Sequence, residues 1–268
     1  MITRLRRCYP RLQNITMLGS EIKVATGTDI VNNRVVLLKE TSRSLGKKTV
    51  DIHEHCQKIG VDCPKIYYTH LYNHMMILEC EYVEGSDLMD WMLLGNEVPV
   101  MSIMKQLITL VNKYKEHDLS HLDIKPENII WNDDTQTVRI IDYESMRPHT
   151  YVGTTPIYDA VGTTSYLSPE VHYDNVYHKN TDLWNIGMVG LVIILRHNPL
   201  VGERVKREEL RQYSRRKLKQ LGTDPELTNL ICRLLNPNPI WRNPQTYKTP
   251  KKLRSWWSRC WAKCCFSC

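Results

Sequence analysis

Residues 121–128 read His-Leu-Asp-Ile-Lys-Pro-Glu-Asn, and this octapeptide determines how the rest of the chain is interpreted. It places a carboxylate at Asp123, an ammonium at Lys125 and an amide at Asn128 on one short loop. An apolar run follows, and a second carboxylate, Asp142, closes what the pattern predicts to be a hairpin. Either carboxylate alone would suit an ordinary polar loop, but the whole set at this spacing indicates a site.

Phosphoryl transfer needs the groups that this loop brings together: a base that positions a hydroxyl, a cation near the γ-phosphate, and oxygen ligands for Mg²⁺. On these residues the chain resembles the eukaryotic-type protein kinase family, of the serine/threonine type, from about residue 18 to residue 242. The resemblance implies an enzyme that transfers the γ-phosphate of ATP to Ser or Thr hydroxyls of proteins. Asp123 would then be the catalytic base and Lys125 a phosphate-binding cation. Asn128 and Asp142 would hold Mg²⁺.

Downstream motifs continue the resemblance in the same order. Residues 162–170, Gly-Thr-Thr-Ser-Tyr-Leu-Ser-Pro-Glu, resemble the motif that ends a kinase activation segment. Residues 182–187, Asp-Leu-Trp-Asn-Ile-Gly, are similar to the start of the buried central helix, and the apolar stretch 183–195 is too short for a bilayer span. The resemblance also implies that Arg242 pairs with Glu170.

Lys39 is the expected nucleotide-binding lysine. It ends the apolar run Val-Val-Leu-Leu-Lys, where the resemblance implies a contact with the α and β phosphates. Its expected partner is Glu54, fifteen residues further on a predicted helix, because the longer carboxylate is typical of the family. Asp51 lies one helical turn earlier and is the alternative.

Other nucleotide contacts are implied at the glycine-rich loop, by Gly19 and Val24, and at the interlobe hinge, by Glu81 and Val83. The loop keeps one of the family's three glycines. Fewer backbone amides can then approach the phosphates closely, so we expect a modest affinity for ATP. Cys80 lies where the depth of the adenine pocket is set, and it is expected to be a buried, inert thiol.

Two departures from the family motifs lie near the site. The usual Asp-Phe-Gly triplet is Asp-Tyr-Glu, in which Tyr143 can pack as an apolar plug if its hydroxyl finds a partner. Glu144 would either cap a local basic group or add a carboxylate near the metal. Leu122 replaces an Arg that often binds a phosphorylated activation segment, so we expect activity without that phosphorylation. The rival interpretation is a pseudokinase or scaffold that keeps the fold.

The expected fold class is α+β, a bilobal kinase-like fold with a small β-rich lobe and a larger, mainly helical lobe. The expected division is 1–80, 81–247, and a tail at 248–268 outside the kinase resemblance. The spacing of apolar residues predicts the strands and helices of these two lobes. The predicted strands are 22–26, 34–39 and 75–83, and the predicted helices are 48–59, 87–94, 100–117, 183–195 and 204–221, the last with Leu210 and Leu218 packing inward.

Charge is unevenly distributed along the 268 residues. The formal net charge is +7, but residues 1–20, 203–220 and 248–268 alone carry +4, +5 and +6. The remainder therefore carries −8, which favours basic protein substrates and argues against nucleic acid as a partner.

The tail at 248–268 has Trp and Cys side chains at spacings of three and four, which gathers them on one face of a helix. Four explanations remain open. They are attachment to a membrane surface with acylation of nearby cysteines, docking on the kinase-like body, a zinc site, and binding of single-stranded nucleic acid.

No secretory signal is recognisable in residues 1–18, and the cysteines are odd in number. Both observations predict an intracellular protein, in the cytoplasm or the nucleus, with reduced thiols. The short N-terminal lobe and the eroded glycine-rich loop resemble kinases of large DNA viruses, herpesvirus-like ones among them. An infected host cell is therefore one expected location.

Overall fold

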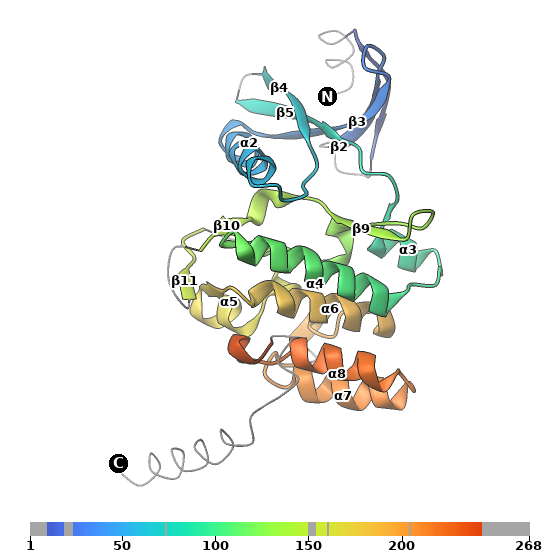
Figure 1. The fold of residues 1–268 in the computed structure, drawn as a ribbon, viewed down its shortest axis with the longest axis vertical. Coiled ribbons are helices and arrows are strands. Elements are labelled where there is room, and N and C mark those ends of the chain that lie inside the picture. Colours follow the sequence, from blue (N-terminus) through green and yellow to red (C-terminus); the bar gives the residue numbers. More distant parts are fainter. Residues whose placement is uncertain are drawn as a thin grey trace.

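The computed structural model describes residues 10–18, 24–72, 74–149, 154–159, 161–203 and 205–242. These residues form two lobes stacked along the long axis of the molecule, as Figure 1 shows. Strands dominate the lobe nearer the N-terminus, and helices dominate the other. The prediction of a bilobal α+β fold is confirmed.

The smaller lobe is built on one antiparallel sheet with the strand order β1-β2-β3-β5-β4. Successive side chains of a strand point to opposite faces, so one face of the sheet can be apolar. On that face Ala25, Val36 and Leu38 are fully buried and pack with Leu12 and Ile77. The five strands are β1 (Leu12–Met17), β2 (Val24–Asp29), β3 (Arg34–Ser42), β4 (Ile66–Tyr72) and β5 (Met75–Glu81).

The sequence prediction missed two of these strands, β1 and β4. β1 buries only Leu12 and Ile15, and β4 buries none of its side chains fully, so neither shows a regular alternation. β2 continues to Asp29, three residues further than predicted. β5 ends two residues earlier than predicted, because its pairing with β3 stops at Glu81.

Helix α2 (Arg43–Lys58) packs on this sheet and begins five residues earlier than predicted. The Ser42 hydroxyl accepts a hydrogen bond from the Leu45 N–H and so caps the helix N-terminus. A Cβ atom at Gly46 would lie only 2.6 Å from Sδ of Met76, so this glycine allows the helix to approach β5 closely. The buried residues of α2 recur at spacings of three and four, and they are Gly46, Thr49, His53 and Cys56.

The larger lobe is a stack of helices, in which α4 packs against α6 and α7 against α8 (Figure 1). The predicted helices at 87–94 and 100–117 are present as α3 and α4. The helices are α3 (Leu88–Leu93), α4 (Val100–Glu116), α5 (Pro169–Asp174), α6 (Thr181–Leu195), α7 (Leu210–Gln220) and α8 (Pro225–Leu234).

Helix α6 is the centre of this lobe and buries 13 of its 15 residues. A helix that is apolar all round belongs in a core, as the sequence predicts for residues 183–195. Leu210 and Leu218 of α7 are also fully buried, as predicted. Among the described residues, the structure has no helix that is both long enough and apolar enough to cross a bilayer.

Short strands and 3₁₀ turns connect the helices of the larger lobe to one another and to the smaller lobe. They are β6 (Ser86–Asp87), β7 (Leu119–Ser120), η1 (Pro126–Asn128), β8 (Ile129–Asn132), β9 (Thr137–Ile140), η2 (Tyr143–Ser145), β10 (Arg147–Pro148), β11 (Thr154–Pro156), η3 (Thr164–Tyr166), β12 (Val176–His178), η4 (Val201–Glu203) and η5 (Pro239–Arg242).

Candidate active site

The octapeptide 121–128 runs from β7 through η1 to the start of β8, and the central helix holds it in place. The Asp182 carboxylate, in the first turn of α6, accepts hydrogen bonds from the backbone N–H of His121 at 2.7 Å and of Leu122 at 2.8 Å. Leu122 has a positive φ of 68°, an uncommon conformation for a branched residue. Burial raises the pKa of Asp182 to about 6, although both N–H donors favour its ionised form.

Asp123 is held by two side chains, one on each carboxylate oxygen. The Thr163 hydroxyl donates to Oδ1 at 2.8 Å, and the Asn128 amide donates to Oδ2 at 3.0 Å. Lys125 Nζ donates to the Thr163 hydroxyl at 2.7 Å and lies 3.4 Å from Oδ2 of Asp123. Asn128 also donates to the Asp123 carbonyl at 2.9 Å, so Nδ2 is fully committed and Oδ1 remains an acceptor.

Thr163 reaches this loop because Gly162 precedes it. Gly162 has a φ of 67°, and a Cβ atom there would lie 2.5 Å from the Leu122 carbonyl oxygen. Only glycine fits such a close approach at a positive φ. The sequence motif included Thr163 but gave no reason to single it out, because its role depends on this contact between distant segments.

Lys39 projects from β3 toward two carboxylates that belong to one triplet. Its Nζ atom lies 3.0 Å from Oδ1 of Asp142 and 2.7 Å from Oε1 of Glu144. Burial alone would lower the pKa of Lys39, but the two carboxylates raise it by more, so this pKa lies above its ordinary value. Burial likewise raises the pKa of Asp142, and the Lys39 ammonium brings it below its ordinary value.

The predicted pairing of Lys39 with Glu54 is wrong. Glu54 and the alternative, Asp51, lie on the exposed face of α2. The helix residues that line the cleft are Thr49 and His53. The buried face of α2 includes a glycine and a threonine, so the spacing of apolar residues in the sequence does not show which side chains of this helix face inward. The sequence therefore could not exclude Glu54.

Tyr143 fills the position of the expected apolar plug and is only 1% exposed. Its ring packs edge-on against His53 and His121, at centroid distances of 5.3 and 5.0 Å. Its hydroxyl donates to the Asp62 carbonyl at 2.8 Å and therefore accepts from the Tyr114 hydroxyl, 2.9 Å away. The expected partner for the buried hydroxyl is present.

A cleft of about 630 Å³ lies between the lobes, a size that suits a nucleotide. Of the predicted nucleotide and metal residues, it is lined by Val24, Lys39, Glu81, Val83, Asn128 and Asp142. Asp123 and Lys125 do not line it but adjoin it through Asn128. Gly19 lies outside the described residues, and Glu54 does not line the cleft.

The apolar walls of the cleft were found only in part from sequence. Leu37 and Leu78 come from the sheet, and Ile130 and Ile141 come from the larger lobe. Apolar runs marked both regions, but only strand register decides which side chain faces the cleft. Cys80 also lines it, and burial raises the pKa of this thiol to about 12, consistent with an inert residue.

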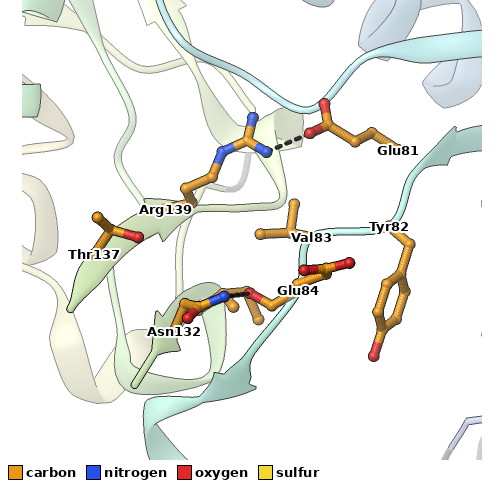
Figure 2. Close-up of a pocket in the computed structure, with 8 residues that line it drawn as sticks. Glu81, Tyr82, Val83, Glu84, Asn132, Thr137 and Arg139 are labelled. Carbon is orange, nitrogen blue, oxygen red and sulfur yellow. Dashed lines mark hydrogen bonds and ion pairs between the residues drawn. The ribbon is translucent and has the colours of Figure 1, made fainter. Parts of the chain in front are cut away.

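The hinge forms the edge of a second hollow of about 320 Å³, which Figure 2 shows. There the Glu81 carboxylate pairs with Arg139 of β9, and Arg139 also donates to Asp62 at 3.0 Å. Glu81 further accepts from the Lys65 N–H at 3.0 Å. Because its carboxylate is committed here, any contact of Glu81 with a ligand in the larger cleft must come from its backbone.

The residues of the cleft fit ATP and Mg²⁺. Lys39 supplies a cation for phosphate, and the Asp142 carboxylate and the Asn128 amide oxygen are ligands of the type that Mg²⁺ prefers. Both oxygen donors line the same cleft as Lys39. The apolar walls suit a purine base, because such sites are mostly apolar with a few placed polar groups.

The end of the activation segment is fixed as predicted. Arg242 donates to Glu170 through two bonds, with Nη2 2.7 Å from Oε2, and both side chains are buried. Thr181 donates to the same carboxylate at 2.9 Å. The tail at 248–268 lies outside the described residues, so the four explanations of it stay predictions.

Comparison with known proteins agrees with this geometry. The serine/threonine-protein kinase cds1 of Schizosaccharomyces pombe is 29% identical over 228 residues, which cover 78% of this chain and 48% of that protein. Myosin light chain kinase family member 4 of Homo sapiens is 31% identical over 134 residues, 48% of this chain and 34% of that protein. Calcium-dependent protein kinase 5 of Plasmodium falciparum is 26% identical over 187 residues, 65% of this chain and 32% of that protein.

This chain spans less than half the length of each of these relatives. A family model described as Protein kinase domain matches residues 19–249, which include every residue of the site described above. The chain therefore belongs to the protein kinase domain family.

Proposed function

We propose that the chain is an ATP-dependent protein kinase that phosphorylates Ser or Thr hydroxyls of protein substrates. The observation that carries the proposal is the arrangement of Asp123, which Thr163 and Asn128 hold on both carboxylate oxygens beside a cleft that contains Lys39 and Asp142. Catalysis of phosphoryl transfer is mainly positioning and charge stabilisation, and these contacts serve both.

Each residue has a distinct role in this proposal. Asp123 orients the substrate hydroxyl and accepts its proton. Lys125 and Lys39 supply cations to the phosphate groups, and Asn128 and Asp142 would hold Mg²⁺. Bound Mg²⁺ would neutralise the charge of the phosphate oxygens.

Three observations favour Ser or Thr as the acceptor. The relatives named above are serine/threonine or other protein kinases, and the sequence Lys-Pro-Glu-Asn at 125–128 is of the serine/threonine type. Thr163 also draws Asp123 and Lys125 together into one compact cluster. Because Thr163 and Lys125 lie so close to Asp123, the short side chain of Ser or Thr fits beside this base.

We further propose that the protein substrates are basic. The residues that line the cleft include Asp87, Asp90 and Glu127, in addition to Asp142. Asp90 and Glu127 are exposed. Acidic residues outnumber the one lysine among the described residues that line the cleft, and an excess of one sign of charge attracts ligands of the opposite sign.

A phosphotransfer assay tests the activity. The purified chain is incubated with Mg²⁺, ATP and a generic basic protein, and mass spectrometry identifies the modified side chain. We expect phosphate on Ser or Thr, and a loss of transfer in Lys39→Met. A chain that binds ATP and Mg²⁺ but transfers no phosphate would be a pseudokinase, and phosphate on Tyr would refute the acceptor assignment.

A further inference from the structure

Both carboxylates that contact Lys39 come from the triplet 142–144, and helix α2 contributes none. The α2 residues that line the cleft are Thr49 and His53, and its acidic residues, Asp51 and Glu54, are exposed. The Nδ1 atom of His53 lies 2.7 Å from the Pro64 carbonyl oxygen, so this ring is bonded within the smaller lobe. The described part of the chain therefore offers Lys39 a partner from the larger lobe only.

We propose that Glu144 is the positioning residue for Lys39, in place of a carboxylate on the helix of the smaller lobe. The proposal rests on the proposed function, because it assigns Lys39 to the phosphates of ATP. It also has a regulatory consequence. Displacement of α2 would not remove the partner of Lys39, so the position of that helix would not switch the enzyme on or off through this ion pair.

The geometry favours Glu144 over Asp142 in this role. Asp142 accepts a hydrogen bond from Lys39 Nζ at 3.0 Å, whereas Glu144 Oε1 forms an ion pair with Nζ at the shorter distance of 2.7 Å. This Glu144 oxygen is buried and has no hydrogen-bond partner among the described residues, so Lys39 is the cation that balances it. The Glu144 side chain is also the more buried, at 21% exposure against 35%, which strengthens an ion pair. Asp142 is assigned to Mg²⁺ in the proposed function, and Glu144 is then the carboxylate left to hold Lys39.

The backbone around Glu144 is fixed by contacts of its own. Glu144 lies in the 3₁₀ turn η2, and its carbonyl accepts from Nη1 of Arg147 at 2.8 Å. On either side, Tyr143 is buried and Ser145 accepts from the Gly162 N–H at 3.3 Å. The backbone that bears the Glu144 side chain is therefore fixed, which a positioning residue requires.

A double-mutant cycle tests whether Glu144 acts through Lys39. Turnover at saturating ATP and Mg²⁺ is measured for wild type, E144Q, K39M and the double variant, and each fold is checked by thermal unfolding. We expect E144Q to lower turnover about 10- to 100-fold, because it removes the negative charge that lies closest to the Lys39 ammonium. Adding E144Q to K39M should then cost less than about twofold, because the two residues form one unit.

Two further arms separate this role from the alternatives. E54Q removes the exposed helix carboxylate, and we expect turnover within about twofold of wild type. A Mg²⁺ titration of E144Q should give a half-saturating concentration within about threefold of wild type. An unaffected E144Q, an E54Q loss as large as that of E144Q, independent losses in the cycle, or recovery of E144Q at high Mg²⁺ would each overturn the proposal.

The role of Glu144 can be tested even if the chain is not an active kinase. If wild type transfers no phosphate, the same four proteins are compared by their affinity for ATP with Mg²⁺. Coupling of Glu144 and Lys39 in that cycle supports the positioning role even though the kinase activity is refuted. Independent effects on affinity, or no nucleotide binding by wild type, overturn it.

Discussion

The Arg242 guanidinium and the Glu170 carboxylate form a doubly bonded pair in which Nη2 lies 2.7 Å from Oε2. Arg242 is 0% exposed, Glu170 is 6% exposed, and the guanidinium also lies 5.2 Å from the centre of the Trp184 ring. The pair joins the end of the activation segment to η5, more than 70 residues later. A buried pair of this kind fixes the segment that carries Thr163 to the helical core.

Loss of one partner of this pair should destabilise the larger lobe. We expect Arg242→Met to lower the free energy of unfolding by about 3–5 kcal/mol, because it leaves a buried carboxylate without its cation. Urea denaturation measures the change. A matched exposed pair is the control. Lys105 lies 3.8 Å from Glu226 with both side chains more than 60% exposed, and Lys105→Met should change the free energy by about 0.5 kcal/mol or less. Equal effects of the two variants would contradict the account.

The hydroxyl of Tyr143 should contribute to stability as well as to the packing of the site. Tyr143→Phe removes a donor to the Asp62 carbonyl and an acceptor for Tyr114, and both of those groups then lack this buried partner. We expect a loss of about 1–3 kcal/mol in the free energy of unfolding. Tyr158→Phe, at a side chain that is 89% exposed, is the matched control and should have no measurable effect. A stable Tyr143→Phe variant would show that the ring alone fixes the triplet.

His121 by itself should lower the stability of the fold in mild acid. Burial lowers the pKa of this fully buried imidazole from 6.5 to about 4. Between these values the unfolded chain binds a proton at His121 that the folded chain does not bind. The contribution of His121 to the free energy of unfolding therefore falls as the pH falls from 6.5 to about 4, by up to about 1.4 kcal/mol per pH unit.

The neighbouring Asp182 acts in the opposite sense, since burial raises its pKa from 3.8 to about 6 and its folded form binds the extra proton in that range. Comparison of wild type with His121→Asn isolates the histidine. Urea denaturation at several pH values should show that, as the pH falls, the free energy of unfolding decreases less, or increases more, in the variant than in wild type. Identical pH slopes in the two proteins would contradict the assignment.

Basic substrates should depend on the exposed acid at the mouth of the cleft. We expect Glu127→Gln to lower kcat/KM for an Arg-rich Ser peptide about three- to tenfold, with little change for a neutral peptide, since a charge near the cleft steers a ligand of opposite sign. The effect should weaken as salt is added. Glu226→Gln, at an exposed acid on α8, is the matched control. Equal losses for both peptides would indicate a role for Glu127 other than charge recognition.

The sequence located those parts of the site that lie within contiguous motifs. Asp123 and Asn128 share one octapeptide and contact each other directly in the structure, as their spacing allows. Lys39 and Asp142 are more than 100 residues apart, and the family resemblance, not the spacing, brought them together. The lobes and the central helix were predictable because long apolar patterns determine a core.

The residues that the sequence misplaced or missed depend on contacts between segments. The family resemblance favours Glu54 as the partner of Lys39 because of its longer carboxylate. The phase of α2 could not correct this choice, because the buried face of the helix contains Gly46 and Thr49. Thr163 acquires its role only through the close approach at Gly162. Glu144 had two open alternatives, and the first, a local basic group, agrees with its contact with Lys39. The chemistry of the side chains alone does not show which distant segments of the chain come into contact.

Asp123→Asn tests whether Asp123 acts as the base of an active kinase. The amide has nearly the same shape and can still accept the Thr163 bond, but it cannot take a proton from a substrate hydroxyl. The measurement is the rate of phosphate transfer from ATP to a basic protein at saturating ATP and Mg²⁺, with nucleotide affinity measured in parallel. We expect a loss of about 10²- to 10⁴-fold in the rate, with ATP affinity within about threefold of wild type. A variant that transfers phosphate at the wild-type rate would contradict this role of Asp123.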